Sequence, residues 1–127
     1  MSLILDTHAA IWFTLNDPQL SSAAKTAIET EPNKVYISPA SYWEIAIKIQ
    51  KGNYRLQVPF QTFWEEAIAG GLTLLPIEIT HADRLITLPT FHRDPFDRMI
   101  VAQGLVEGLT LVSCDSILDR YNIPRIW

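Results

Sequence analysis

Four acidic residues stand at positions from which their carboxylates can meet at one site. Asp6 and Asp115 each directly follow a short apolar run, whereas Glu44 and Asp97 lie in the first turns of two segments that read as helices. Four carboxylates in one cleft repel each other unless a cation neutralises them. Oxygen ligands of this kind suit Mg²⁺ and Mn²⁺, which support phosphoryl chemistry when they keep open positions. The pattern therefore indicates a carboxylate site for a divalent cation.

The segment around Asp97 gives the clearest local prediction. Asp94 suits a helix N-cap, because its carboxylate can accept hydrogen bonds from the free amide groups of the first turn. Pro95 suits the first helical position, and the residues from Phe96 onward are almost wholly apolar until Gly108, which suits the end of a helix. We expect a helix that is buried on most sides and carries a carboxylate at its start.

The elements that must position these acids are short apolar segments alternating with helical ones. Strands are expected at residues 2–5, 35–38, 72–75 and 109–114, with an edge strand at 124–127. Helices are expected to start near residues 6, 21, 39, 60, 80, 94 and 115. Continuous apolar strands separated by helices favour a parallel sheet covered on both faces. Ligands bind beyond the carboxyl ends of such strands, which is where the four acids are expected.

Length and composition fit one α/β domain spanning residues 1–127. The chain is 48% hydrophobic and 19% charged, and 127 residues are enough for one core but too few for two. No apolar run approaches the roughly 20 residues of a membrane span, and the N-terminus lacks a signal-peptide pattern. The single Cys114 fits a reducing compartment, so we expect a cytoplasmic protein without membrane contact. The net charge of −4 argues against coating nucleic acid by charge alone, but not against a nucleic-acid enzyme.

The same acids are open to other interpretations. Each acid, taken singly, is also explained as an ordinary helix-start residue stabilised by the macrodipole, and for Asp94 the N-cap role is sufficient. A phosphoacceptor receiver domain needs adjacent acids after its first strand and a lysine after a late one. Here Asp6 is followed by Thr7, and no lysine occurs after Lys51. A phosphate-binding loop is excluded, because no G-x-x-x-x-G-K-[ST] pattern exists.

The most specific motif of the chain is His92–Gln103, with the sequence HRDPFDRMIVAQ. Together with Leu5–Ala9, Trp43–Lys48 and Ser113–Asp115, it resembles the PIN-domain nucleases, and within them the VapC-like toxins of prokaryotic toxin–antitoxin pairs. The resemblance covers essentially the whole chain. It implies a three-layer α/β/α domain with a parallel sheet of five strands. It also implies Mg²⁺ or Mn²⁺ held by four acids, which fall here on Asp6, Glu44, Asp97 and Asp115.

The same resemblance implies an activity and partners. The activity is endonucleolytic hydrolysis of RNA by an activated water, and the partners are a cognate antitoxin and a second copy in a homodimer. The family often has a hydroxyl two residues before the last acid, where Ser113 stands to orient a water. Thr7, Asp94 and Arg98 adjoin the acids as supporting residues. The alternative is a catalytically silent module of the same fold that binds protein or RNA; loss of one acid would support it, and all four are present.

Neighbouring residues carry further local predictions. Arg98 either meets the RNA backbone or balances the charge of the adjacent acids, and the second role is favoured because an acid cluster needs local counter-charge. Ser41 and Glu44 fit an S-x-x-E capping box, and Glu44 and Lys48 fit a favourable i,i+4 pair. These contacts would fix the orientation of Glu44.

Three more residues flank the motifs. Trp43 is expected to pack beneath the following acid. Cys114 is expected to be a buried strand residue and no nucleophile, because no general base is placed for it. His92 either contacts phosphate or shapes the loop before its helix.

Overall fold

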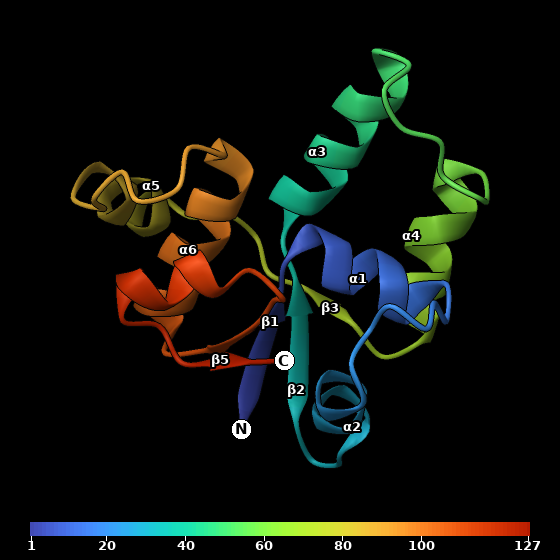
Figure 1. The fold of residues 1–127 in the computed structure, drawn as a ribbon, viewed down its shortest axis with the longest axis horizontal. Helices are drawn as coiled ribbons and strands as arrows, with labels where there is room; N and C mark the ends of the chain where they lie inside the picture. Colours follow the sequence, from blue (N-terminus) through green and yellow to red (C-terminus); the bar gives the residue numbers. More distant parts are fainter.

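The computed structural model describes residues 1–127, and strands alternate with helices along the chain (Figure 1). The strands are β1 (Ser2–Leu5), β2 (Lys34–Ile37), β3 (Thr73–Leu74), β4 (Thr110–Val112) and β5 (Arg125–Ile126). The α-helices are α1 (Thr7–Thr14), α2 (Ser22–Glu29), α3 (Pro39–Gln50), α4 (Phe60–Ala69), α5 (Ile79–Ile86) and α6 (Pro95–Glu107). A 3₁₀ helix, η1 (Ser116–Tyr121), precedes β5.

The five strands form one wholly parallel sheet in the order β3-β2-β1-β4-β5. The central strand β1 pairs on both sides, so that Leu5 lies opposite Ile37 of β2 and Val112 of β4. The carboxyl ends of these three strands are therefore level. The predicted parallel sheet is confirmed, and residues that follow its inner strands start from one edge.

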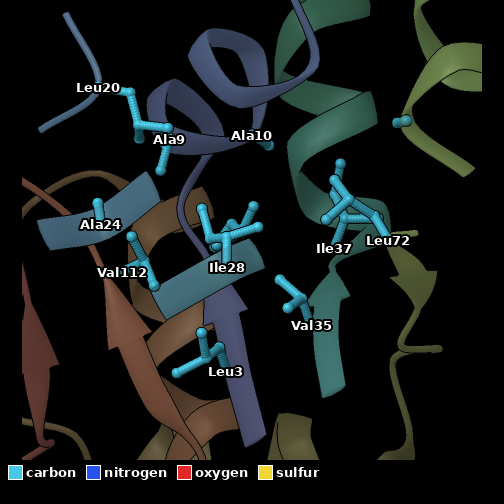
Figure 2. Packing of buried hydrophobic residues seen from close by; sticks show 12 residues of the cluster. Leu3, Ala9, Ala10, Leu20, Ala24, Ile28, Val35, Ile37, Leu72 and Val112 are labelled. Atoms are coloured by element: carbon cyan, nitrogen blue, oxygen red, sulfur yellow. The ribbon is translucent and has the colours of Figure 1, made fainter. Parts of the chain in front are cut away.

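Helices cover both faces of the sheet, which confirms the three-layer α/β/α architecture. Side chains of β1 alternate between the faces: Leu3 and Leu5 belong to one core cluster, and Ile4 belongs to the other. Figure 2 shows the first cluster, in which Leu3 and Val112 of the sheet lie beneath helices α1 and α2. The second cluster joins the opposite face to α6, η1 and the start of α3.

Helix α3 extends beyond the carboxyl edge of the sheet (Figure 1). A small third cluster fixes it there, in which Ile45 of α3 packs against Ile11 of α1 and Phe63 of α4. These apolar contacts hold the middle of α3 above the end of β1. An acid in that part of α3 can therefore reach the sheet edge.

The predicted helix after Asp94 is confirmed at both ends. Asp94 is the N-cap of α6, and Gly108 closes the helix in the left-handed conformation with φ 69°. Within α6, Gly104 permits a close approach to the segment before β5: an added Cβ would lie 2.6 Å from Cδ1 of Ile123. The absence of a side chain at Gly104 thus lets α6 pack tightly, with its first turn at the sheet edge.

Two local predictions about element ends were wrong. The N-cap of α3 is Ser38, whose hydroxyl accepts from the amide of Ala40, so Ser41 and Glu44 form no capping box. The reason is Pro39, which takes the first helical position and starts the helix earlier. Strand β4 ends at Val112, so that Cys114 lies beyond the strand and is exposed.

No helix has the length and apolar character that spanning a bilayer requires.

Candidate metal centre

Four different elements bring the four predicted acids to the carboxyl edge of the sheet. Asp6 links β1 to α1, and Asp115 follows β4 and begins η1. Glu44 comes from the part of α3 that extends beyond the sheet, and Asp97 comes from the first turn of α6. The charges of the other three acids all act on the Asp97 carboxyl, so the four lie near one another.

Potential ligand atoms at this edge form two groups that share Asp97, and Asp6 belongs to neither of them. Ligand atoms of Glu44, Asp94 and Asp97 lie within 4.8 Å of one another. Ligand atoms of His92, Asp97 and Asp115 do so as well. Asp97 is thus the centre of the cluster, and Asp94 and His92 belong to its surroundings in addition to the predicted acids.

Asp6 is a buried acid fixed at the junction of strand and helix. Its side chain accepts from the amide of Ala9 at 2.8 Å, and its own amide donates to the Val112 carbonyl at 3.1 Å. Burial raises the pKa of the Asp6 carboxyl, while the Ser113 hydroxyl and the Ala9 amide act in the opposite direction. Ser113 is itself fully buried and accepts from the amide of Asp115 at 3.1 Å. Ser113 therefore lies between two of the acids.

Glu44 is oriented by side chains from two helices. Thr7 donates its hydroxyl proton to Oε1 at 2.6 Å, and Lys48 donates to Oε2 at 2.6 Å. The Ser41 hydroxyl lies 3.1 Å from that of Thr7. The predicted pair of Glu44 and Lys48 is confirmed, and both oxygens of a carboxylate that is only 3% exposed have a partner. Trp43, by contrast, does not pack beneath Glu44 but is 64% exposed.

Asp94 and Asp97 have different roles at the start of α6. Asp94 accepts from the amides of Phe96 at 2.8 Å and Asp97 at 3.2 Å, as an N-cap does. Burial, and then the charges of Asp94, Asp6 and the other acids, raise the pKa of Asp97 to about 8. Without a cation, Asp97 therefore keeps its proton at neutral pH, because a further negative charge is unfavourable there.

His92, which the sequence left open between a phosphate contact and a role in shaping the loop, lies against two of the four predicted acids. Its Nδ1 accepts from the amide of Asp94 at 3.0 Å. Its Nε2 lies 2.9 Å from Oδ2 of Asp115 and 3.4 Å from Oδ2 of Asp97. The spacing His92-Arg93-Asp94 could have indicated the contact with the amide two residues on. The contact with Asp115 spans 23 residues and needs the fold.

Arg98 does not act as counter-charge, so this prediction was wrong. Its guanidinium donates to the carbonyl of Leu88 at 3.1 Å and forms no ion pair with Asp94 or Asp97. Successive residues of a helix point about 100° apart, since a turn takes 3.6 residues, and Arg98 thereby faces away from its neighbour. Lys48 is the one lysine or arginine that pairs with an acid of the cluster.

The donor set fits a hard divalent cation. Carboxylate oxygens are the ligands that such ions prefer, and one lysine cannot balance this many acids. Burial, and then the charges of the neighbouring acids, raise the pKa of Asp97, so its ionised form is unfavourable there without a cation. Partial desolvation and the charge of Asp6 raise the pKa of the Cys114 thiol, which disfavours the reactive thiolate form.

The fold and this cluster together define a nuclease-like α/β domain, and comparison with known families identifies it. The chain belongs to the PIN domain family, whose model matches residues 3–124. Among curated relatives, Ribonuclease VapC22 of Mycobacterium tuberculosis is 30% identical over 125 residues, which cover 98% of this chain and 95% of that protein.

Solved structures share the fold at lower identity. VapBC2 from Rickettsia felis, bound to a DNA fragment from its promoter, matches with a TM-score of 0.74 and 17% identity over 98% of this chain and 97% of that one. VapBC-1 from nontypeable Haemophilus influenzae matches with a TM-score of 0.65 and 16% identity over 98% and 96%. A toxin-antitoxin complex from Klebsiella pneumoniae matches with a TM-score of 0.61 and 19% identity over 90% and 87%. At these identities the likeness concerns the fold.

Proposed function

We propose that this protein is a metal-dependent endoribonuclease, the toxin of a toxin–antitoxin pair, and that residues 1–127 act as one nuclease domain in the cytoplasm. The observation that carries the proposal is the burial of Asp97 among other carboxylates, which raises its pKa to about 8. A bound cation would offset the mutual repulsion of these carboxylates. Membership of the PIN family and the relative named as a ribonuclease support the same conclusion.

Asp6, Glu44, Asp97 and Asp115 are proposed to hold Mg²⁺ or Mn²⁺ and to form the catalytic centre. When bound, such a cation supplies Lewis-acid assistance to the attack of water on phosphorus and to the departure of the 3′ oxygen. The four acids would supply the negative charge and the oxygen ligands that hold the cation. Their origin in four elements makes the centre a property of the whole fold.

The supporting residues fix the acids rather than the substrate. Thr7 and Lys48 each hold one oxygen of Glu44, so this carboxylate presents a defined orientation. Ser113 accepts from the amide of Asp115 and partly offsets the raised pKa of Asp6. The carboxylate of Asp94 caps the N-terminus of α6 and so fixes the helix that carries Asp97.

RNA, a cognate antitoxin and a second copy of the chain are the proposed partners. The Klebsiella neighbour is described as a toxin-antitoxin complex, which supports an antitoxin for a chain of this fold. Large apolar side chains stand on the surface of this chain, including Trp43 on α3 and Ile79 and Ile86 on α5. Exposed apolar side chains of this size favour protein partners.

The direct test is cleavage of RNA by the purified protein with Mg²⁺ or Mn²⁺, compared with Asp97→Asn. We expect the variant to lose at least about 100-fold in rate, since a catalytic metal contributes several kcal/mol and 1.4 kcal/mol is tenfold. Asp83→Asn is the matched control, because Asp83 is an exposed acid of α5 outside the cluster. Its rate should equal that of the wild type.

Two results would contradict the proposal. One is full activity of Asp97→Asn, which would remove the central acid from the mechanism. The other is a wild-type protein that cleaves no RNA in a mixed pool, with either metal and without antitoxin. The second result would instead favour a catalytically silent module of the PIN fold that binds RNA or protein.

A further inference from the structure

The imidazole of His92 is held at both of its nitrogens. Nδ1 accepts a hydrogen bond from the amide of Asp94 at 3.0 Å, so Nδ1 carries no proton. The proton of the ring is then on Nε2, which lies 2.9 Å from Oδ2 of Asp115. A main-chain amide thereby fixes the tautomer, and the tautomer makes Nε2–H a donor toward Asp115.

The carboxylate of Asp115 has a hydrogen-bond partner at each of its oxygens. Asp115 follows the end of β4, and its side chain is about one third exposed, at 34%. One of its oxygens accepts from the amide of Ile117 at 3.1 Å, which serves the start of η1. The other oxygen accepts from His92. The same Nε2 lies 3.4 Å from Asp97, so the ring connects the acid that follows β4 to the acid of α6.

We propose that His92 is a positioning residue of the metal centre: its Nε2–H holds the carboxylate of Asp115 beside that of Asp97 before the cation arrives. This inference rests on the proposed function and extends it to a residue outside the four acids. A ligand carboxylate that is hydrogen-bonded in advance loses less freedom when the cation binds, and such outer partners commonly contribute 10- to 100-fold in metal affinity. In this tautomer His92 acts through Asp115 and is itself no ligand.

Two substitutions of His92 test the contacts of its two ring nitrogens separately. In His92→Asn the amide can match Nδ1 and still accept from the Asp94 amide, but nothing reaches Asp115. In His92→Gln the longer amide can match Nε2 and still donate to Asp115. His8→Asn is the matched control, since His8 is exposed, lies two residues after Asp6 and stacks on Trp12 without a hydrogen bond to any carboxylate.

The measurement is the dissociation constant of Mn²⁺ for each folded variant, by calorimetry or by the paramagnetic signal of free Mn²⁺, without RNA. We expect His92→Asn to bind about 10-fold more weakly than the wild type. His92→Gln should stay within about 3-fold, which is the rescue that a merely structural role would not give. His8→Asn should stay within about 2-fold.

Equal Mn²⁺ affinity of His92→Asn and the wild type would overturn the inference, and so would equal weakening by Asn and Gln. If affinity falls in Asp97→Asn but not in His92→Asn, the role of His92 fails and the proposed function stands. If the wild type binds no Mn²⁺, both the proposed function and the role of His92 fail.

A second readout needs neither metal nor variants. Nitrogen-15 NMR of the metal-free wild type distinguishes the two neutral tautomers of each histidine by the shifts of the two ring nitrogens. We expect His92 to carry its proton on Nε2. A proton on Nδ1 would overturn the inference whatever the result with Mn²⁺, because Nδ1 could then not accept from Asp94.

Discussion

Two histidines of this protein make the same pair of hydrogen bonds in different surroundings. In His81, Nδ1 accepts from the amide of Glu78 at 2.9 Å, and Nε2 lies 2.8 Å from a carboxylate oxygen of Glu107. In His92, Nδ1 accepts from a nearby amide at 3.0 Å, and Nε2 lies 2.9 Å from a carboxylate oxygen. The local chemistry of the two rings is the same.

The difference lies in what surrounds the carboxylate. His81 is completely buried and connects the first turn of α5 to Glu107 at the end of α6. Glu107 is 39% exposed and belongs to no cluster of acids. The partner of His92 stands beside Asp97, whose pKa is raised to about 8. The pair of His81 and Glu107 therefore joins two helices. The pair of His92 and Asp115 lies in a group of carboxylates whose negative charge favours a bound cation.

The largest expected effect is a loss of stability when His81 is replaced. His81→Ala removes a buried ring and leaves the Glu78 amide and Glu107 without their partner. We expect the free energy of unfolding to fall by about 3 kcal/mol, the usual range for a lost buried ring and its hydrogen bonds. Chemical denaturation measures this. A stabilisation by Mn²⁺ that disappears in the folded His81→Ala variant would show that the two regions are not independent.

A smaller change in stability, of opposite sign, is expected when Asp97 of the cluster is replaced. The pKa of Asp97 is about 8 in the folded chain against about 4 in an unfolded one, so its contribution to stability is full below about pH 4 and is lost as pH rises to about 8. Asp97→Asn should therefore make the metal-free protein more stable at pH 8, by about 2 kcal/mol after allowance for partial exposure.

Denaturant titrations at pH 5 and pH 8 measure the contrast between wild type and variant. The gain should shrink at pH 5, where Asp97 keeps its proton in the folded chain. A variant that is less stable than the wild type at both values would instead mean that Asp97 serves mainly to stabilise the start of α6.

Much of the fold follows from local signals in the sequence. Asp94, Pro95 and Gly108 mark the two ends of α6 by their own backbone chemistry, and the apolar runs mark the inner strands. The convergence of the four acids was also predictable in outline, because parallel strands end at one edge of a sheet. The sequence alone thus indicates where the cluster lies.

The remaining features depend on packing between distant segments. Arg98 turns to the Leu88 carbonyl, which α5 and its loop bring within reach. Trp43 is exposed because α3 extends beyond the sheet, and Cys114 is exposed because β4 ends two residues earlier than its apolar run. The contact of His92 with Asp115 arises only when α6 packs beside β4. No local pattern carries that information.

The most direct test of the central claim, that the carboxylate cluster binds a divalent cation, is a melting curve with and without about 10 mM Mn²⁺. With a dissociation constant near 1 mM, linkage gives roughly 1.4 kcal/mol of stabilisation, which is a rise of about 3–5 °C for a domain of this size. The account predicts this rise for the wild type and none for Asp97→Asn. An equal rise in both proteins, or none in the wild type, would contradict it.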